Sequence, residues 1–232
     1  MNDEQKRAVG FAAVDRFATD DMRCVGLGTG STARWAIERV GERVAKGWRV
    51  VAVATSDETE RLCRERGVPV VTFGDGPPID VAIDGADEVA PDFSLIKGGG
   101  GALFREKAVA IAAKQFIVIV DESKLVRRLG RFPLPVEVVP YSRSYVAGEL
   151  RKLCPAVKLR MSADSPFMTD NGNHILDCSF GEIPAPSELD EGLRRIHGVV
   201  ATGIFCGLTS HVLVGSATGV RELEHAALSP RA

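Results

Sequence analysis

The sequence predicts an α/β protein with a doubly wound, mostly parallel, Rossmann-like sheet and an inserted small ferredoxin-like α+β domain. Two observations lead to this prediction. In the first half, short valine and isoleucine runs alternate with segments of helical spacing, which is typical of strands covered by helices on both faces. From residue 131 the order becomes strand, helix, two strands, helix and strand, which is the ferredoxin-like order.

Each element of the first half is predicted from its apolar pattern and its flanking residues. The helix expected over 56–67 starts at a serine and ends at a glycine, the residue types favoured at these positions. The apolar run 211–216 is expected to return to the large sheet. The other predicted strands are 24–28, 48–54, 68–73, 80–84 and 116–120, and the other predicted helices are 31–45 and 101–115.

The order of the predicted strands and helices changes in the second half, and this change sets the expected domain boundaries. Prolines bracket a strand within 131–140, and a turn at 169–172 leads into another strand. The ferredoxin-like domain is therefore predicted to span 131–205, and the Rossmann-like catalytic domain to consist of 1–130 and 206–232. The remaining elements are helices over 142–154 and 187–196 and strands over 156–161, 173–180 and 198–205.

Composition and charge exclude several classes of function. The net charge of −2 gives no reason to expect nucleic acid or an anionic membrane as a partner. No apolar run is long enough to span a bilayer, and the N-terminus lacks the apolar core of a signal peptide. The five cysteines form no CxxC pair, and the four histidines show no metal-ligand spacing. We therefore expect a cytoplasmic protein with reduced thiols and no metal site.

Parallel sheets bind ligands at the carboxyl ends of their strands, so the loops that follow the strands are the candidate site. The first such loop, GTGST over 28–32, offers glycines, hydroxyls and a helix N-terminus, which suit a phosphate group. Gly28, Gly30 and Ala33 also fit the dinucleotide fingerprint, but the match is short. The loop lacks the lysine of a Walker motif, and a simple glycine turn with a serine cap is the remaining alternative.

A second loop, DGADEV over 84–89, places three carboxylates after a predicted strand. Clustered acids are costly unless they bind a cation, hold sugar hydroxyl groups or share protons. Because Asp-Gly is also a common turn pair, a solvated turn is the simpler alternative for this segment alone.

The third loop, LIKGGGGALFREK over 95–107, places four glycines between Lys97 and Glu106. A tight loop of this kind offers backbone N–H groups to an oxyanion. Taken singly, Lys97 could be a surface lysine and Glu106 an ordinary first-turn glutamate. A fourth loop, DESKLV over 121–126, adds Lys124. The four loops contain no histidine and no cysteine pair, which favours proton transfer on a phosphorylated sugar over hydrolysis or redox chemistry.

Six motifs in this order make the sequence similar to a known family along nearly its whole length. They are GLGTGSTA, DGADEV, LIKGGGGALFREK, DESKLV, LGRFPLPVEVVP and TDNGNHILD. The chain resembles ribose-5-phosphate isomerase of the A type. The resemblance implies interconversion of D-ribose 5-phosphate and D-ribulose 5-phosphate in the non-oxidative branch of the pentose phosphate pathway. It also implies the absence of a cofactor and a homodimer or homotetramer.

The resemblance assigns roles residue by residue. Glu106 matches the catalytic base, and our hypothesis adds Lys97 as oxyanion stabiliser and Asp84 as helper in hydroxyl proton transfer. The implied substrate-binding residues are Lys6, Thr29, Gly30, Ser31, Thr32, Asp84, Gly85, Ala86, Asp87, Lys97, Gly98, Gly99, Gly100 and Lys124. The alternatives are a non-catalytic sugar-phosphate-binding module, a related sugar-phosphate deaminase or lactonase, and, from the glycine loop alone, a nicotinamide or methyl-donor enzyme.

Overall fold

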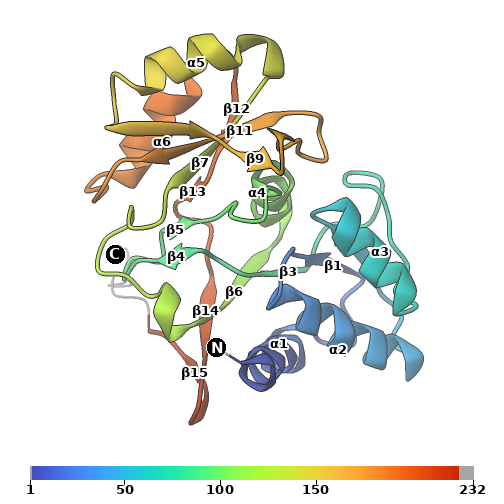
Figure 1. The fold of residues 1–232 in the computed structure, drawn as a ribbon. Helices are drawn as coiled ribbons and strands as arrows, with labels where there is room; N and C mark the ends of the chain where they lie inside the picture. The colour runs from blue at the N-terminus through green and yellow to red at the C-terminus, as the bar shows by residue number, and fades with distance from the viewer. Residues whose placement is uncertain (1, 225–232) are drawn as a thin grey trace, which may run out of the picture. The chain divides into compact units, whose positions relative to one another are not determined.

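The computed structural model describes residues 2–224 and divides the chain into two compact units (Figure 1). The first unit contains the chain up to Ala86, then Arg105–Leu125 and the residues from Leu208 onward. The second unit contains Asp87–Phe104 and Val126–Gly207. Each unit has its own apolar core. The part of the predicted catalytic domain that covers 225–232 lies outside the described residues.

A six-stranded sheet forms the centre of the first unit, in the order β15-β14-β6-β3-β1-β2. All neighbours in it are parallel except the edge strand β15, which is antiparallel to β14. The prediction of a mostly parallel sheet that includes residues 211–216 is thus confirmed. The strands are β1 (Cys24–Leu27), β2 (Val51–Ala54), β3 (Val81–Asp84), β6 (Gln115–Asp121), β14 (His211–Ser216) and β15 (Gly219–Glu222).

Helices cover both faces of this sheet, as a doubly wound fold requires. Val25 and Leu27 of β1 pack in one core cluster with α1 (Asp3–Phe17) and α2 (Ala33–Ala45). Gly26 faces the other way, because successive side chains of a strand alternate between faces. A Cβ atom on Gly26 would lie 2.4 Å from Cγ1 of Val109, which belongs to α4 (Leu103–Ala112). The remaining helix of this unit is α3 (Asp57–Glu65).

Helix α1 was not among the predicted elements. A capping box starts it: the Asn2 side chain accepts a hydrogen bond from the Gln5 N–H, and the Gln5 side chain accepts one from the Asn2 N–H. The sequence does contain this N-terminal signal. Only part of the helix is buried, however, and its apolar pattern is weak.

The predicted strand over 68–73 is shorter than expected. The structure forms a single parallel bridge there, between Val70 and Ala52. Ala52 donates to the carbonyl of Pro69 and accepts from the N–H of Val71. Phe73 and Gly74 are then exposed, so the chain leaves the edge of the sheet before a full strand can form.

A four-stranded antiparallel sheet forms the centre of the second unit, in the order β12-β7-β11-β8. Leu134, Val136 and Val138 of β7 pack in one core cluster with residues of both helices of this unit. The ferredoxin-like arrangement is therefore confirmed (Figure 1). Its elements in chain order are β7 (Leu134–Val138), α5 (Arg143–Leu150), β8 (Ala156–Leu159), β11 (His174–Ser179), α6 (Pro186–Arg194) and β12 (Val199–Thr202).

A third, three-stranded sheet places residues 87–104 in the second unit. β5 (Leu95–Ile96) pairs with β4 (Glu88–Val89) on one side and with β13 (Ile204–Phe205) on the other. The predicted boundaries had placed 87–104 and 126–130 in the first domain, whereas the contacts group both segments with the ferredoxin-like elements. A short hairpin of β9 (Met161–Ser162) and β10 (Ser165–Pro166) also belongs here.

Two short 3₁₀ helices complete the fold, η1 (Glu122–Lys124) after β6 and η2 (Pro140–Ser142) before α5. None of the helices among residues 2–224 combines the length and the apolar character needed to cross a bilayer.

Candidate active site

The strand order of the first unit locates its ligand-binding edge. The chain passes from β1 to β2 on one side of the sheet, and from β3 to β6 on the other. In such folds, ligands bind beyond the carboxyl ends of the strands where the order reverses, here β1 and β3. The predicted loop 28–32 follows β1, and Asp84 is the last residue of β3. Two of the four predicted loops therefore come together at this switch point.

Asp84 is held against the loop that follows β1. Its Oδ1 atom accepts hydrogen bonds from the N–H groups of Thr29, at 3.2 Å, and Gly85, at 2.7 Å. Only 3% of Asp84 is exposed. A Cβ atom on Gly28 would lie 1.9 Å from the same Oδ1 atom, so only glycine lets the two segments approach this closely. The position of the carboxylate thus depends on the absence of a side chain at residue 28.

A cluster of hydroxyl groups that the sequence analysis did not identify holds Thr29. Its Oγ1 atom lies 2.9 Å from Oγ1 of Thr55, 2.8 Å from Oγ of Ser56 and 3.1 Å from Oγ1 of Thr59. Thr59 in turn donates to the carbonyl of Gly28 at 2.9 Å. The signal that could have found this cluster is the run of hydroxyl residues directly after β2. Because the N–H and the hydroxyl group of Thr29 are both bonded inside the protein, Thr29 shapes the loop.

The hydroxyl groups nearest to the start of α2 are arranged differently. Lys6 on α1 donates from Nζ to Oγ of Ser31 at 3.0 Å, which joins two residues that lie 25 positions apart. Thr32 occupies the N-cap position of α2, but its side chain makes no capping hydrogen bond. Gly30 has a φ of +111° and open space around it. A lysine and two hydroxyl groups beside a helix N-terminus form a setting that suits an anion.

Glu106 and Lys124 come from two other elements of the first unit. Glu106 lies in the first turn of α4 and is 5% exposed. Its neighbour Arg105 points elsewhere and donates to Oδ1 of Asp57 at 2.7 Å. Lys124 is half-buried and lies on η1, immediately after β6. A carboxylate buried in a first helical turn experiences a cost from desolvation and a gain from the helix dipole.

The second unit carries Asp87, Lys97 and the glycine loop. Asp87 Oδ2 accepts a hydrogen bond from the Gly99 N–H at 2.7 Å, and a Cβ atom on Gly99 would lie 2.6 Å from Asp87 Oδ1. Lys97 is 3% exposed, and its N–H donates to the carbonyl of Gly203 at 2.9 Å. Its Nζ atom lies 5.6 Å from the centre of the Phe205 ring. Ala86, which is also a predicted substrate-binding residue, directly precedes Asp87 and is the last residue of a segment of the first unit.

Hydrogen bonds within the glycine loop reduce its capacity to bind an oxyanion. The N–H of Gly99 is bonded to Asp87, and the N–H of Gly101 donates to the carbonyl of Gly98 at 3.0 Å. Within residues 2–224, the structure gives no hydrogen-bond partner to the N–H groups of Gly98 and Gly100. The four glycines therefore offer two N–H donors at most, where the sequence alone suggested several.

Burial distinguishes the predicted catalytic residues from ordinary charged residues. Burying a charge is costly, and clusters of buried charged groups mark functional sites. Among the described residues, the buried Asp, Glu and Lys side chains are those of Asp84, Glu88, Lys97, Glu106 and Glu137. Glu88 accepts from the N–H groups of Gly130 and Phe132, and Glu137 accepts from Thr169 and Asn173, so these two carboxylates connect segments of the second unit. The other three are the predicted catalytic residues.

The structure thus brings the predicted residues together in three groups. Asp84 and Gly85 lie with the loop after β1, Lys6 lies with Ser31, and Asp87 lies with Gly99. Within the described part of the chain, no group of three or more His, Cys, Asp or Glu side chains could hold a metal ion. The hydroxyl cluster after β2 occupies the position where a dinucleotide-binding fold would place its ribose-binding acid.

The sequence of this chain is similar to those of known proteins. The family model described as ribose 5-phosphate isomerase A (phosphoriboisomerase A) matches residues 51–219. A ribose-5-phosphate isomerase A 1 of Oceanobacillus iheyensis is 45% identical over 214 residues, covering 92% of this chain and 95% of the relative. A ribose-5-phosphate isomerase A of Bartonella quintana is 47% identical over 225 residues, covering 94% and 96%.

Solved structures agree over nearly the whole chain. A D-ribose-5-phosphate isomerase in complex with phospho-erythronic acid has a TM-score of 0.91 and 39% identity, covering 97% of this chain and 100% of that one. The ribose 5-phosphate isomerase A of Methanocaldococcus jannaschii has a TM-score of 0.89 and 38% identity, with the same coverage.

Proposed function

This chain belongs to the ribose 5-phosphate isomerase A family, and on that premise we propose that it interconverts D-ribose 5-phosphate and D-ribulose 5-phosphate with Glu106 as the proton carrier. The observation that carries the assignment of Glu106 is its burial: it is a 5% exposed carboxylate in the first turn of the helix that follows Lys97 and the glycine loop. A buried carboxylate with a task in proton transfer is the group that an aldose–ketose isomerase needs.

The reaction moves one proton between adjacent carbons. In the forward direction Glu106 removes the proton from C2 of the open-chain aldose. The C2–H electron pair forms a C1–C2 double bond, and the C1 carbonyl becomes an enediolate oxyanion. Glu106 then returns the proton to C1, while the C2 hydroxyl loses its proton and becomes the ketone. The hydroxyl proton reaches O1, so atoms and charges balance without a redox partner.

Two other buried charges support this step. We assign stabilisation of the oxyanion to the Lys97 ammonium, because a preorganised positive group is worth most where water is excluded. We assign transfer of the hydroxyl proton, and opening of the sugar ring, to Asp84, which is fixed by two backbone N–H groups. Asp87 is expected to hold sugar hydroxyl groups with its remaining acceptor capacity.

The phosphate group has its own set of residues. Lys6, Ser31 and Thr32 lie around the N-terminus of α2, where N–H groups and the helix dipole attract an anion. Lys124 is assigned to the same phosphate as a second cation. These residues are proposed to bind the substrate equally in the ground state and the transition state, so their loss should raise KM more than it lowers kcat.

The test is an assay for ribulose 5-phosphate formation from ribose 5-phosphate without added metal or cofactor, applied to the wild type, Glu106→Gln and Lys124→Ala. Because a positioned base contributes about 10²–10⁴-fold, Glu106→Gln should lower kcat by that order while KM changes little. Lys124→Ala should mainly raise KM. A Glu106→Gln protein with near-normal turnover would refute the assignment of the base, and an inactive wild type would refute the activity.

We also propose that the protein works in the cytoplasm as a homodimer or homotetramer. Two facts support a reducing compartment: all five cysteines are free thiols, and four of them are buried. Burial raises the pKa of the Cys24 thiol to about 11 and that of Cys63 to about 12, so neither thiol is reactive in the folded state. Sedimentation at several protein concentrations measures the oligomeric state directly.

A further inference from the structure

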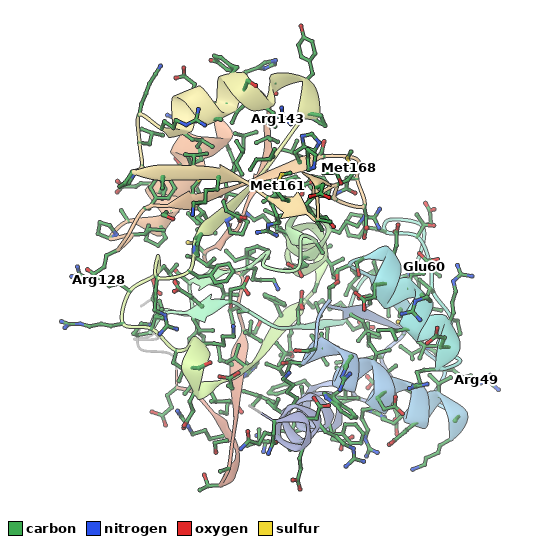
Figure 2. The ribbon with its side chains drawn as sticks, in the orientation of Figure 1. Arg49, Glu60, Arg128, Arg143, Met161 and Met168 are labelled. Atoms are coloured by element: carbon green, nitrogen blue, oxygen red, sulfur yellow. The ribbon has the colours of Figure 1, made fainter. Side chains whose placement is uncertain are left out.

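One arginine side chain binds two consecutive carbonyl groups of the glycine loop. Arg160, between β8 and β9, donates from Nη1 to the carbonyl of Gly98 at 2.8 Å and to that of Gly99 at 3.1 Å. Figure 2 labels Met161, the next residue, on β9 of the second unit. All of these residues belong to this unit. The loop that precedes α4 is therefore tied to the small domain by its peptide oxygens.

Arg160 is itself held in place by Asp177 of β11. Nε of Arg160 lies 3.0 Å from Oδ2 of Asp177, and Nη2 lies 2.5 Å from Oδ1, which is a two-pronged carboxylate–guanidinium pair. The side chains are 14% and 25% exposed, so solvent screens the pair only partly. The Arg160 N–H also donates to the carbonyl of Ile175 at 2.9 Å. Such a pair fixes the plane of the guanidinium as well as its position.

Fixing the carbonyls also fixes the N–H groups on the other side of the same peptides. A peptide bond is planar and trans, so its N–H points opposite to its C=O. The Gly98 carbonyl shares a peptide with the Gly99 N–H, and the Gly99 carbonyl shares one with the Gly100 N–H. Both carbonyls converge on one nitrogen of Arg160, and both N–H groups therefore point away from it. Successive N–H groups on one side form a concave, anion-binding arrangement.

The Gly99 N–H identifies what lies on that side. It donates to Oδ2 of Asp87 at 2.7 Å. The Gly100 N–H points to the same side and has no partner within residues 2–224.

We infer that Arg160 and Asp177 are positioning residues that hold the Gly98–Gly100 peptides so that the Gly100 N–H, on the side where Asp87 lies, donates a hydrogen bond to the substrate oxygen that becomes negatively charged in the reaction. This inference rests on the proposed function of the Lys97–Gly100 segment in substrate binding. It also selects one donor among the four glycines. Neither Arg160 nor Asp177 touches the substrate; both act through the loop.

The experiment compares Arg160→Met, Arg160→Lys and Asp177→Asn with a matched control in the full-length enzyme. The control is Arg128→Met, because Arg128 forms an ion pair with Glu182 in the same unit, at 3.0 Å, and both side chains are exposed; Figure 2 shows Arg128 projecting from its loop. Loss of one oxyanion donor costs about 10²–10³-fold in kcat, so a donor that is only misaligned should cost about 10–10²-fold. We expect that loss for Arg160→Met, a smaller one for Arg160→Lys and Asp177→Asn, and less than twofold for Arg128→Met.

A purely structural role is excluded by a second readout. The amide proton resonance of Gly100 should shift when phospho-erythronic acid binds to the wild type, and this shift should disappear in Asp177→Asn even if that variant keeps its melting temperature. If Arg160→Met fails to fold, Arg160→Lys and Asp177→Asn carry the test. Normal kcat in these variants would overturn the inference. So would a ligand-induced shift of the Gly100 resonance in Asp177→Asn that equals the shift in the wild type. Glu106→Gln, assayed in parallel, separates this result from failure of the proposed function. Lost turnover in Glu106→Gln together with normal kcat in the Arg160 and Asp177 variants overturns this inference alone, whereas near-normal turnover in Glu106→Gln overturns the proposed role of Glu106.

Discussion

Asp84 and Gly28 show how a residue without a side chain determines the position of a carboxylate that we propose to be catalytic. Asp84 accepts hydrogen bonds from the N–H groups of Thr29 and Gly85, and the carboxylate occupies the space that a Cβ atom on Gly28 would need. The sequence identified both residues, but as members of two separate loops. Their contact is a property of the sheet, because β1 and β3 are neighbours only in the folded protein.

This contact leads to a prediction for Gly28→Ala. The new methyl group would start 1.9 Å from Oδ1, so the carboxylate must move. Overpacking of this kind costs about 1–3 kcal/mol of unfolding free energy, and a displacement of about 1 Å can cost 10²-fold in rate. Urea unfolding and steady-state kinetics measure both effects. The control is Gly148→Ala in α5, where the added atom meets nothing within 4 Å; that variant should keep full activity. An unchanged kcat in Gly28→Ala would contradict the prediction.

Residue types were predictable from the sequence, whereas their hydrogen bonds were not. Asp84, Lys97 and Glu106 were noticed in loops at the end of predicted strands, and the resemblance to the family gave Glu106 its role. The sequence could not show that the Gly99 N–H is already bonded to Asp87. It gave no role to Arg160 either, because that residue lies about sixty positions beyond the glycine loop. Contacts of this range depend on how the sheets assemble, which local patterns do not encode.

At the scale of elements, Asp80 fixes the start of β1 to the start of β3. Its Oδ2 atom accepts from the N–H groups of Arg23, at 2.8 Å, and Cys24, at 3.2 Å, and its Oδ1 atom accepts from Nζ of Lys114 at 2.7 Å. Burial raises the pKa of this carboxyl, but the Lys114 hydrogen bond and the two backbone N–H groups outweigh burial and hold the pKa below its ordinary value. The charged form is therefore favoured by folding.

Asp80 should make the stability depend on acid pH. Because the folded-state pKa lies below the unfolded one, the stabilisation is present above about pH 4 and is lost as the pH falls through the folded-state pKa. Asp80→Asn should lower the free energy of unfolding by about 1–3 kcal/mol at pH 7, since hydrogen bonds to a charged group are worth that much. The difference from the wild type should shrink below pH 4. Denaturant melts across this range provide the measurement, with the exposed Asp75→Asn as control; a gap that stays constant down to pH 2 would contradict the assignment.

Long, strongly apolar elements were predictable, and short ones were not. The strands β1, β3, β6 and β14 have the buried, mainly apolar residues expected of a covered parallel sheet. By contrast, β4, β5 and β13 have two residues each, which is too short for any periodic signal. The predicted strand over 68–73 had the right composition, but it reaches the sheet only at one bridge. Whether each of these segments forms a strand depends on its pairing partner, which the sequence does not reveal.

At the scale of the whole molecule, the two units are interleaved along the chain. The chain passes from one unit to the other after Ala86, Phe104, Leu125 and Gly207. Only one inserted domain was predicted from the sequence. The order of strands and helices changes visibly at residue 131, whereas no such change marks residues 87–104. The segment 87–104 carries Asp87 and Lys97, so the smaller unit also supplies two of the proposed substrate-binding residues.

The interleaving predicts that the fragment 131–205 does not fold stably by itself. It lacks Ala90 and Ile96, which are part of the core cluster of this unit, and it lacks β5, the partner of β13. It also loses Glu88, which accepts a hydrogen bond from the N–H of Phe132 at 2.6 Å. Each large apolar side chain removed from a core costs about 1.5–3 kcal/mol, and a domain of this size has little stability in reserve.

The comparison needed is with a polypeptide in which a glycine–serine linker joins 87–104 to 126–207. This longer polypeptide contains all three strands of the β13-β5-β4 sheet and the whole core cluster of the second unit. We expect it to melt cooperatively and to give dispersed amide resonances, while 131–205 shows a broad, non-cooperative transition. Because the longer polypeptide adds residues 87–104, 126–130 and 206–207, equal melting temperatures would mean that these segments together contribute nothing to the stability of this unit. The boundaries predicted from the sequence would then describe an autonomous domain after all.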